Sequence, residues 1–504
     1  MVCDTGFAYR EERTRPVPCS LPWRRSIFNL SSHLSDGFKD HECFSTKNRR
    51  LQARSDDMHK LLMLLSLAAL PAFGVPLRLA TFRADVTPPI GAPLCGGLVK
   101  PVVGVSEPLL ALGVVILSDD RPVVLCAVDW CEIRAGDHVH WREVLAQAAG
   151  TTPERVAVQS LHQHNAPIAD SASHQLLSGF HSPPSVVDIA WAERALQGVA
   201  QNIAAALKTA EPVTHLAHGE AAVAQVASNR RIMGTDGKVA KMRLSSTKDA
   251  ALRELPEGLV DPMLKTISFW NGEKKLAALH YYATHPMSYY GDGMVTYDFV
   301  GTARERRTQE DGVPHVYFTG CGGNIAAGKY NDASKGARVR LGENVHAAMV
   351  ASEQDMKRLP LTKIEWRASP VVLKSNPEFP EERMLKVCEN ATTAASTRIG
   401  AAFRVGFIRQ SAADVPIQFT SLHLGDDVCL LHLPGETFIE YQLLAQQQRP
   451  GAFVATASYG DGAPGYIPLE KSFAEGGYEP TQAFAAPDSE KVMRETIAEL
   501  LRVK

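Results

Sequence analysis

Short apolar runs alternate along this chain with segments whose apolar residues recur every three to four positions. Residues 114–117 and 123–129 are apolar runs on either side of an Asp-Asp-Arg-Pro turn, which predicts two neighbouring strands. Residues 191–208 place Leu196, Val199 and further apolar side chains at helical spacing, which predicts an amphipathic helix. This alternation predicts a mixed α/β fold.

The same pattern continues to the end of the chain. The predicted strands are residues 275–282, 316–319, 417–424 and 428–433, the last two joined as a hairpin by a Gly-Asp-Asp turn. Residues 489–501 predict a closing helix. Residues 360–380 contain four prolines and are predicted to be the least regular internal stretch.

Residues 58–74 have the pattern of a secretory signal peptide. A basic start at Met58-His59-Lys60 precedes an apolar run that ends in small residues, and this run is shorter than the roughly 20 residues that span a bilayer. We therefore expect translation to begin at Met58, so that residues 1–57 are an unstructured leader from a mis-assigned start. Residues 75–504 then form the mature globular domain, which we expect to be secreted or periplasmic.

The composition argues against a nucleic-acid partner but excludes few other functions. The chain has 504 residues, 45% of them hydrophobic, and a formal net charge of −2, so nothing favours a nucleic-acid partner. The six cysteines after residue 75 form no Cys-x-x-Cys pair, which argues against a thiolate zinc knuckle. We expect buried free thiols.

Two histidines, His162 and His164, end the apolar run that begins at Val156. On an extended strand, residues two apart share a face and lie roughly 6–7 Å apart, near enough to serve one metal ion or one reacting group. Imidazole is the commonest metal ligand and proton carrier near neutral pH. The alternative is an ordinary pair of surface histidines at a strand end.

Further fragments with polar side chains follow later strands. His285-Pro286 ends one apolar run, and Glu436 follows a Leu-Pro-Gly turn. Tyr466 lies in a Gly-Tyr-Ile-Pro segment, twelve residues before Tyr478. Each fragment alone is a weak signal, because such residues at strand ends are more often structural than catalytic.

Together, the order of these fragments and the residues in them resemble the neutral/alkaline ceramidase family, zinc amidases that cleave the N-acyl bond of ceramide. The resemblance covers roughly residues 78–480. Its motifs are Asp85-Val86-Thr87-Pro88, residues 162–167, Asn229-Arg230, His285-Pro286, residues 320–324, Pro434-Gly435-Glu436 and residues 466–478.

The resemblance implies an α/β, mixed-sheet zinc hydrolase domain that cleaves an amide by metal-activated water. The implied ligands of Zn²⁺ are His162, His285, Glu436 and Tyr466. The implied catalytic residues are His164 for proton transfer, Tyr478 for the oxyanion, and Asp298, which keeps its place in the family's catalytic segment. Arg230 is implied to contact a polar part of the substrate.

The chain departs from the family pattern in several places. Tyr297 stands where the family has a catalytic serine, and Asn324 where its glycine-rich turn usually has Asp. Few residues follow Tyr478, so we expect the family's C-terminal immunoglobulin-like domain to be absent. The expected substrate is an N-acylsphingosine or another lipid or small-molecule amide, with transient membrane-surface contact and no obligate protein partner. The alternatives are a hydrolase of a different amide or ester and a catalytically silent metal- or lipid-binding protein.

Overall fold

The structure is a computed structural model that describes residues 76–502. The predicted leader and signal peptide lie outside the described residues. Within residues 76–502, no helix combines the length and the hydropathy that crossing a membrane requires.

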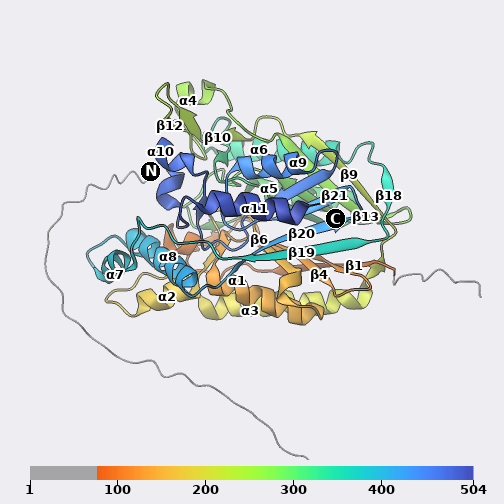
Figure 1. Cartoon of the computed structure of the whole chain (residues 1–504), viewed down its shortest axis with the longest axis horizontal. Helices are drawn as coiled ribbons and strands as arrows, with labels where there is room; N and C mark the ends of the chain where they lie inside the picture. The colour runs from red at the N-terminus through yellow and green to blue at the C-terminus, as the bar shows by residue number, and fades with distance from the viewer. Residues whose placement is uncertain (1–75, 503–504) are drawn as a thin grey trace, which may run out of the picture. The chain divides into compact units, whose positions relative to one another are not determined.

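The first of three large sheets contains five strands in the order β6-β4-β3-β1-β8. These are β6 (Val156–Ser160), β4 (Val123–Val128), β3 (Leu110–Leu117), β1 (Arg78–Asp85) and β8 (Glu211–Pro212). Strands β3 and β4 are the two predicted neighbouring strands and pair antiparallel, whereas β6 runs parallel to β4. Helices α1 (Ala135–Ala149) and α3 (Ile189–Ala206), the latter the predicted amphipathic helix, cover one face of this sheet (Figure 1).

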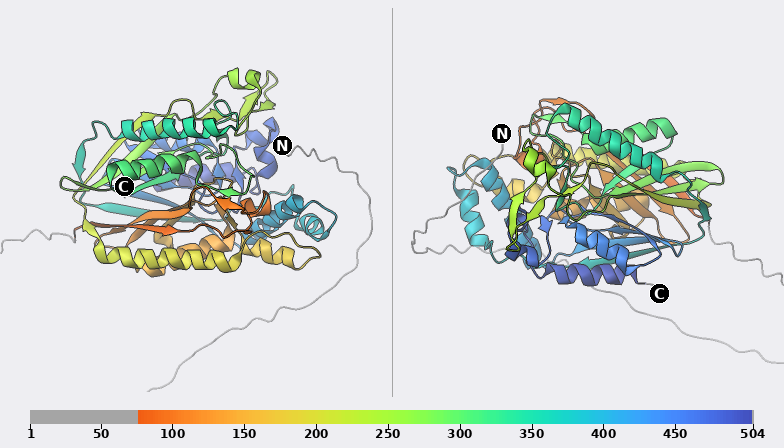
Figure 2. Two further views of the ribbon diagram at one scale, coloured as in Figure 1. Left: turned by 180° about the vertical axis from the view of Figure 1, so that it is seen from behind. Right: turned by 90° about the horizontal axis from the view of Figure 1, so that it is seen from above.

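The second sheet also has five strands, in the order β16-β14-β13-β9-β18. These are β16 (His315–Thr319), β14 (Lys274–Tyr282), β13 (Met263–Asn271), β9 (His215–Ala222) and β18 (Arg358–Pro360). Helices α5 (Asp298–Asp311) and α6 (Lys335–Ser352) pack on its outer face. The left view of Figure 2 shows the resulting layers, with helices outside and the two sheets between them.

The third sheet has the order β19-β20-β21-β23. These strands are β19 (Ile364–Val371), β20 (Ile417–Leu424), β21 (Val428–His432) and β23 (Phe453–Ala457). The predicted hairpin is β20 and β21, and helices α9 (Ile439–Gln448) and α11 (Ser489–Leu501) pack against the sheet. The prediction that residues 360–380 are irregular is wrong for β19. An edge strand tolerates Pro370 because one side of its backbone needs no partner.

Short elements connect the three sheets. The paired short strands are β2 (Gly104–Val105) with β15 (Met294–Val295), β5 (Glu132–Ile133) with β7 (Ile168–Ala169), β10 (Ser228–Asn229) with β17 (Ile325–Ala326), β11 (Arg231–Met233) with β12 (Val239–Met242), and β22 (Glu436–Thr437) with β24 (Tyr466–Ile467). The remaining α-helices are α2 (Ser171–Ser178), α4 (Ala250–Glu254), α7 (Glu381–Glu389), α8 (Ala395–Ala412) and α10 (Lys471–Glu475).

Side chains of the first sheet alternate between two apolar cores, as strand geometry requires. Phe82 and Val124 pack in one core with Trp191 of α3, whereas Leu79 and Leu125 lie in the other core. That second core includes residues from the second and third sheets, so the sheets pack on one another. The predicted mixed α/β class is confirmed.

Candidate metal centre

Three segments from three different sheets meet at the candidate site. His162 follows β6, His285 follows β14, and Glu436 follows β21 as the first residue of β22. Each of these strands has a parallel neighbour. Side chains that follow the carboxyl ends of such strands lie in a common crevice, which is where α/β proteins commonly place their sites.

The polar atoms of these residues converge on one point. His162 Nε2 lies 3.1 Å from Glu436 Oε2, and His285 Nε2 lies 3.0 Å from the same oxygen. The two imidazole centroids are 5.0 Å apart, and all three side chains are buried. The three residues could therefore hold one metal ion.

Backbone carbonyls fix the orientation of both imidazoles. His162 Nδ1 lies 3.0 Å from the carbonyl oxygen of Cys131, and His285 Nδ1 lies 2.7 Å from that of Gly322. Because a carbonyl only accepts, each Nδ1 carries a proton, and Nε2 is the ring nitrogen that faces Glu436. Lone pairs on two nitrogens and a carboxylate repel one another unless a cation, either a proton or a metal ion, lies between them. Outward Nδ1–H bonds of this kind are typical of metal-ligating histidines.

This arrangement shifts the pKa values of all three groups. Burial, with a contribution from Arg230, lowers the pKa of His285 to about 4. Burial would also lower the pKa of His162, but the neighbouring Glu436 raises it to about 9. Against the effect of burial, the two imidazoles hold the pKa of Glu436 well below its usual range. Without a metal ion, the site therefore keeps a proton at neutral pH.

Tyr466 lies beside the three convergent groups. Its strand β24 pairs with β22 so that Tyr466 is opposite Glu436, and its Oη lies 3.4 Å from His285 Nε2. Arg230 Nη1 donates to Tyr466 Oη at 2.9 Å, while the Arg230 Nε lies 3.5 Å from a carboxylate oxygen of Glu479. Burial raises the pKa of Tyr466 well above its usual value, and Arg230 opposes that rise. The phenol oxygen is thus held beside the three convergent groups by the hydrogen bond from Arg230.

Tyr478 lies at the open side of this group. Its ring centroid is 5.8 Å from that of Tyr466, and the Arg230 guanidinium carbon lies 5.4 Å from the Tyr478 ring. Tyr478 is 44% exposed, so a bound molecule can contact part of this residue.

His164 lies next to His162, but not as an extended strand would place it. Strand β6 ends at Ser160, and His162 has a left-handed φ of 73°. This turn is held because the His162 N–H donates to the Trp130 carbonyl at 2.9 Å. The prediction of two side chains on one strand face is therefore wrong: the rings are 5.2 Å apart and nearly perpendicular. His164 Nε2 is buried without a hydrogen-bond partner among the described residues.

Asp298 and Tyr297 lie at the start of α5, where their neighbours are loop and helix groups. The Asp298 carboxylate accepts from the Ser288 N–H at 3.0 Å and lies 3.6 Å from Arg338 Nε. Tyr297 packs with its ring 5.4 Å from the Arg304 guanidinium. The structure thus ties Asp298 to the segment that follows His285, while the Tyr297 phenol adjoins a different ion pair.

Tyr459 is a site residue that the sequence analysis missed. Its ring stacks on His162 with centroids 4.4 Å apart, and it has a left-handed φ of 63°. Its hydroxyl is buried without a partner among residues 76–502. A tyrosine between serine and glycine, with no repeated spacing, carries no signal in sequence. Its position arises only because β23 and β6 end side by side, where the Ser160 N–H donates to the Tyr459 carbonyl.

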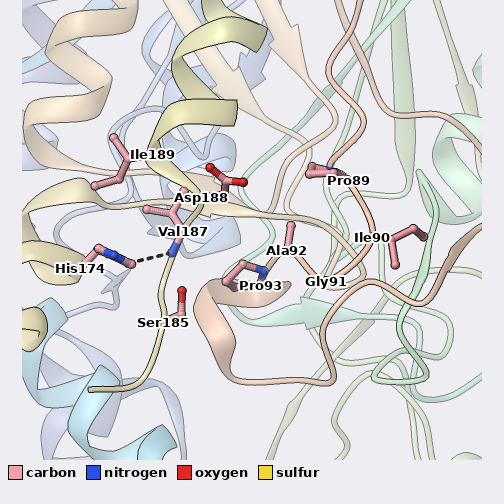
Figure 3. A pocket seen from close by; sticks show the side chains of 10 residues that line it. All are labelled: Pro89, Ile90, Gly91, Ala92, Pro93, His174, Ser185, Val187, Asp188 and Ile189. Carbon is pink, nitrogen blue, oxygen red and sulfur yellow. Dashed lines mark hydrogen bonds between the residues drawn. The ribbon is translucent and has the colours of Figure 1, made fainter. Parts of the chain in front are cut away.

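Two other places in the described residues contain different chemistry. Asp311, His315 and Glu353 also lie close together, but Lys275 pairs with both carboxylates and so already supplies a cation. A surface hollow between residues 89–93 and the start of α3 is lined by none of the residues of the metal centre (Figure 3). There, His174 Nδ1 accepts backbone N–H groups, which is a structural use of the ring.

The fold is that of solved ceramidase structures. The structure of neutral ceramidase from Pseudomonas aeruginosa superposes with a TM-score of 0.62 at 15% identity, over 85% of this chain and 74% of that chain. A ceramidase complexed with C2 gives a TM-score of 0.60 at 14% identity, over 85% and 75% of the two chains. No family model matches the sequence, and no curated protein matches it. The shared fold agrees with the resemblance carried by the sequence motifs.

Proposed function

We propose that this chain is a zinc-dependent amidohydrolase, similar to ceramidases, whose substrate is an N-acylsphingosine or a related N-acyl lipid. The observation that carries the proposal is the convergence of two imidazole nitrogens and a carboxylate oxygen at the ends of three sheets. That convergence occurs on a fold shared with ceramidases.

The donor set fits zinc. His162, His285 and Glu436 offer the nitrogen and oxygen donors that zinc takes, and Tyr466 offers a phenol oxygen beside them. Imidazole-rich sites suit zinc better than magnesium or calcium, which prefer oxygen ligands throughout. When bound, Zn²⁺ would supply a Lewis acid and lower the pKa of water toward about 7.

Several side chains around the donors have roles in this proposal. His164 accepts and returns a proton through Nε2, which has no described partner. The Tyr478 O–H donates a hydrogen bond to the oxyanion, and Arg230 orients both Tyr466 and the polar part of the substrate. Asp298 holds the backbone that follows His285.

Tyr297 occupies the position of the family's catalytic serine, and this difference bears on which group attacks the amide. Tyr297 packs beside Arg304, and burial raises its pKa to about 12, so it is a poor nucleophile. We therefore propose that water attacks the amide carbonyl. The same departure favours the second candidate, a hydrolase that acts on a different amide or an ester.

The proposal includes export of the chain and contact with a membrane surface. Residues 58–74 would direct the chain out of the cytoplasm as a signal peptide, and an amide-bearing lipid would be met by transient contact with a membrane surface. No obligate protein partner is required. The N-terminus of the mature protein, determined by mass spectrometry, tests the export step.

Zinc quantitation combined with hydrolysis of a fluorescent acyl-sphingosine analogue tests the function. We expect near-stoichiometric zinc and release of the acyl chain, both lost in Glu436→Gln because a ligand disappears. Glu440→Gln is the matched control, since Glu440 is a half-buried carboxylate on α9 that accepts a hydrogen bond from the Asn324 side chain. Activity on short acyl amides but not on the sphingosine analogue would select the second candidate. Protein without zinc would contradict both.

A further inference from the structure

Two thiols lie beside the metal centre in positions that the proposed hydrolysis does not use. Cys95 Sγ is 3.9 Å from Cys131 Sγ and 3.9 Å from His164 Nδ1. Cys131 Sγ also lies within 4.8 Å of nitrogens of both His162 and His164. Both cysteines are free and buried.

These separations match the edges of a metal coordination shell. Around a tetrahedral zinc ion, two thiolates lie about 3.8 Å apart and a thiolate and an imidazole nitrogen about 3.6 Å apart. The observed 3.9 Å values are close to both. A disulfide would instead need the two sulfurs about 2.0 Å apart, which requires a much larger movement. Both contacts are thiol hydrogen bonds in this structure, and their lengths fit a shared cation better than a covalent bond.

The backbone holds the thiols in fixed relation to the histidine loop. The Cys95 N–H donates to the Ala166 carbonyl at 2.7 Å, and the Cys131 N–H to the Pro167 carbonyl at 2.8 Å. The Cys131 carbonyl in turn accepts from His162 Nδ1. Because these bonds link both cysteines to residues 162–167, the three donor atoms need little ordering before they bind an ion.

We propose that Cys95, Cys131 and His164 form a second metal site, specific for thiophilic divalent cations such as Cd²⁺, whose occupation inhibits the enzyme. Binding converts both thiols to thiolates and releases two protons to solvent. An imidazole that ligates through Nδ1 keeps its proton on Nε2 and can no longer accept one there. The inhibition rests on the proposed role of His164, whereas the binding does not depend on any catalytic activity.

Cadmium titration of the full chain carrying its own metal tests the site. Thiolate-to-cadmium charge transfer produces an ultraviolet band, and the donors of the first centre include no thiolate. We expect the wild type to bind one additional Cd²⁺ with this band. Cys95→Ser and Cys131→Ser should each lose the band and bind that ion at least about tenfold more weakly. Cys388→Ser, a buried thiol on α7 that bonds the Arg398 carbonyl, should keep the band.

Further measurements separate the outcomes. Inhibition by Cd²⁺ that is relieved in Cys131→Ser supports the proposal. If the protein hydrolyses nothing but shows the band, the metal site is supported and only the hydrolase is refuted. A wild type without the band, or a band of equal strength in Cys131→Ser, overturns the second site. Circular dichroism confirms that each variant is folded, and Cys95→Ala replaces any serine variant that is not.

Discussion

Glycine at two neighbouring positions lets the backbone close around the metal centre. A Cβ at Gly323 would lie 2.3 Å from the Glu436 carbonyl oxygen, and one at Gly322 would lie 2.9 Å from Tyr459 Oη. The first clash is with backbone and cannot be relieved by moving a side chain. The Gly-Cys-Gly-Gly-Asn turn is thus explained by close approach to Glu436 and Tyr459, two residues far away in the sequence.

At the residue scale, the Tyr478 hydroxyl can be tested apart from metal binding. In Tyr478→Phe we expect unchanged zinc content, because the ring adjoins Tyr466 without belonging to the convergent donors. We expect kcat to fall by about 10²–10³-fold, the usual effect of removing one oxyanion donor. Tyr330→Phe, whose hydroxyl bonds Glu257, is the control. An unchanged kcat in Tyr478→Phe would remove this residue from the mechanism.

His432 makes the stability of the protein sensitive to acid. The ring packs against both Tyr281 and Phe318, and burial lowers its pKa from the usual 6.5 to about 3. Between pH 6.5 and about 3, the His432 ring binds a proton in the unfolded chain but not in the native state. The free energy of unfolding therefore falls as pH falls, by about 1.4 kcal/mol per pH unit. Above pH 6.5 the ring is neutral in both states and makes no such contribution.

The variant His432→Gln isolates this effect, since the amide can still bond the Tyr281 hydroxyl. We expect the stability of the variant relative to the wild type to rise as pH falls from about 7 to about 4. Urea denaturation at a series of pH values measures the difference. A difference that does not change with pH would mean that His432 is protonated in the native state.

Site residues could be predicted where a short motif carries them. The His-x-His, His-Pro and Pro-Gly-Glu fragments contain His162, His285 and Glu436, which the structure brings together. Tyr459 and Cys131 contact the same histidine, yet no motif indicates them. Their contacts depend on a left-handed turn and on a backbone carbonyl, neither of which leaves a mark in a single sequence.

At the scale of elements, strands and helices with a clear apolar pattern were predicted closely. Helix α11 and strand β20 have the predicted bounds, because their inward residues follow the expected periods. Strand β19 was missed since its prolines indicated irregularity, although an edge position tolerates them. The end of β6 was placed too late because tertiary hydrogen bonds to Trp130, not local preference, turn the chain at His162.

Two glycine substitutions compare a position where neighbouring atoms leave no room for a Cβ with one where there is room. In Gly113→Ala of β3, the new Cβ would lie 2.1 Å from the Leu125 carbonyl oxygen in the adjacent strand. We expect a loss of about 1–3 kcal/mol or more. Gly198→Ala in α3 meets no atom within 4 Å and should gain about 0.5–1 kcal/mol. Thermal denaturation of both variants measures the contrast, and equal effects would contradict the packing of β3 between β1 and β4.

At the scale of the whole molecule, a bound metal ion would join all three large sheets. Its inferred ligands follow β6, β14 and β21, one strand from each sheet. Removing the metal with a chelator should lower the melting temperature. The loss should be about 2.7 kcal/mol if free metal stands at a hundred times its dissociation constant. Glu436→Gln should show no response to the chelator, and a wild type without any response would argue against metal binding.

The arrangement of the three sheets exceeded what the sequence could predict. Hydrophobic periodicity marks a strand, but it does not say which strands are neighbours. In the second sheet, β9 pairs with β18, although well over a hundred residues separate them. Such pairing is decided by long-range packing in the shared core, so only the class of fold followed from the pattern.

The order of the ligands along the chain has a consequence for biosynthesis. His162, His285, Glu436 and Tyr466 are spread over three hundred residues, and β22 can pair with β24 only after Tyr466 exists. If these four residues are the ligands, the centre cannot assemble on a growing chain until Tyr466 has been made. On the proposed ligand set, the metal would be acquired late in synthesis or after it.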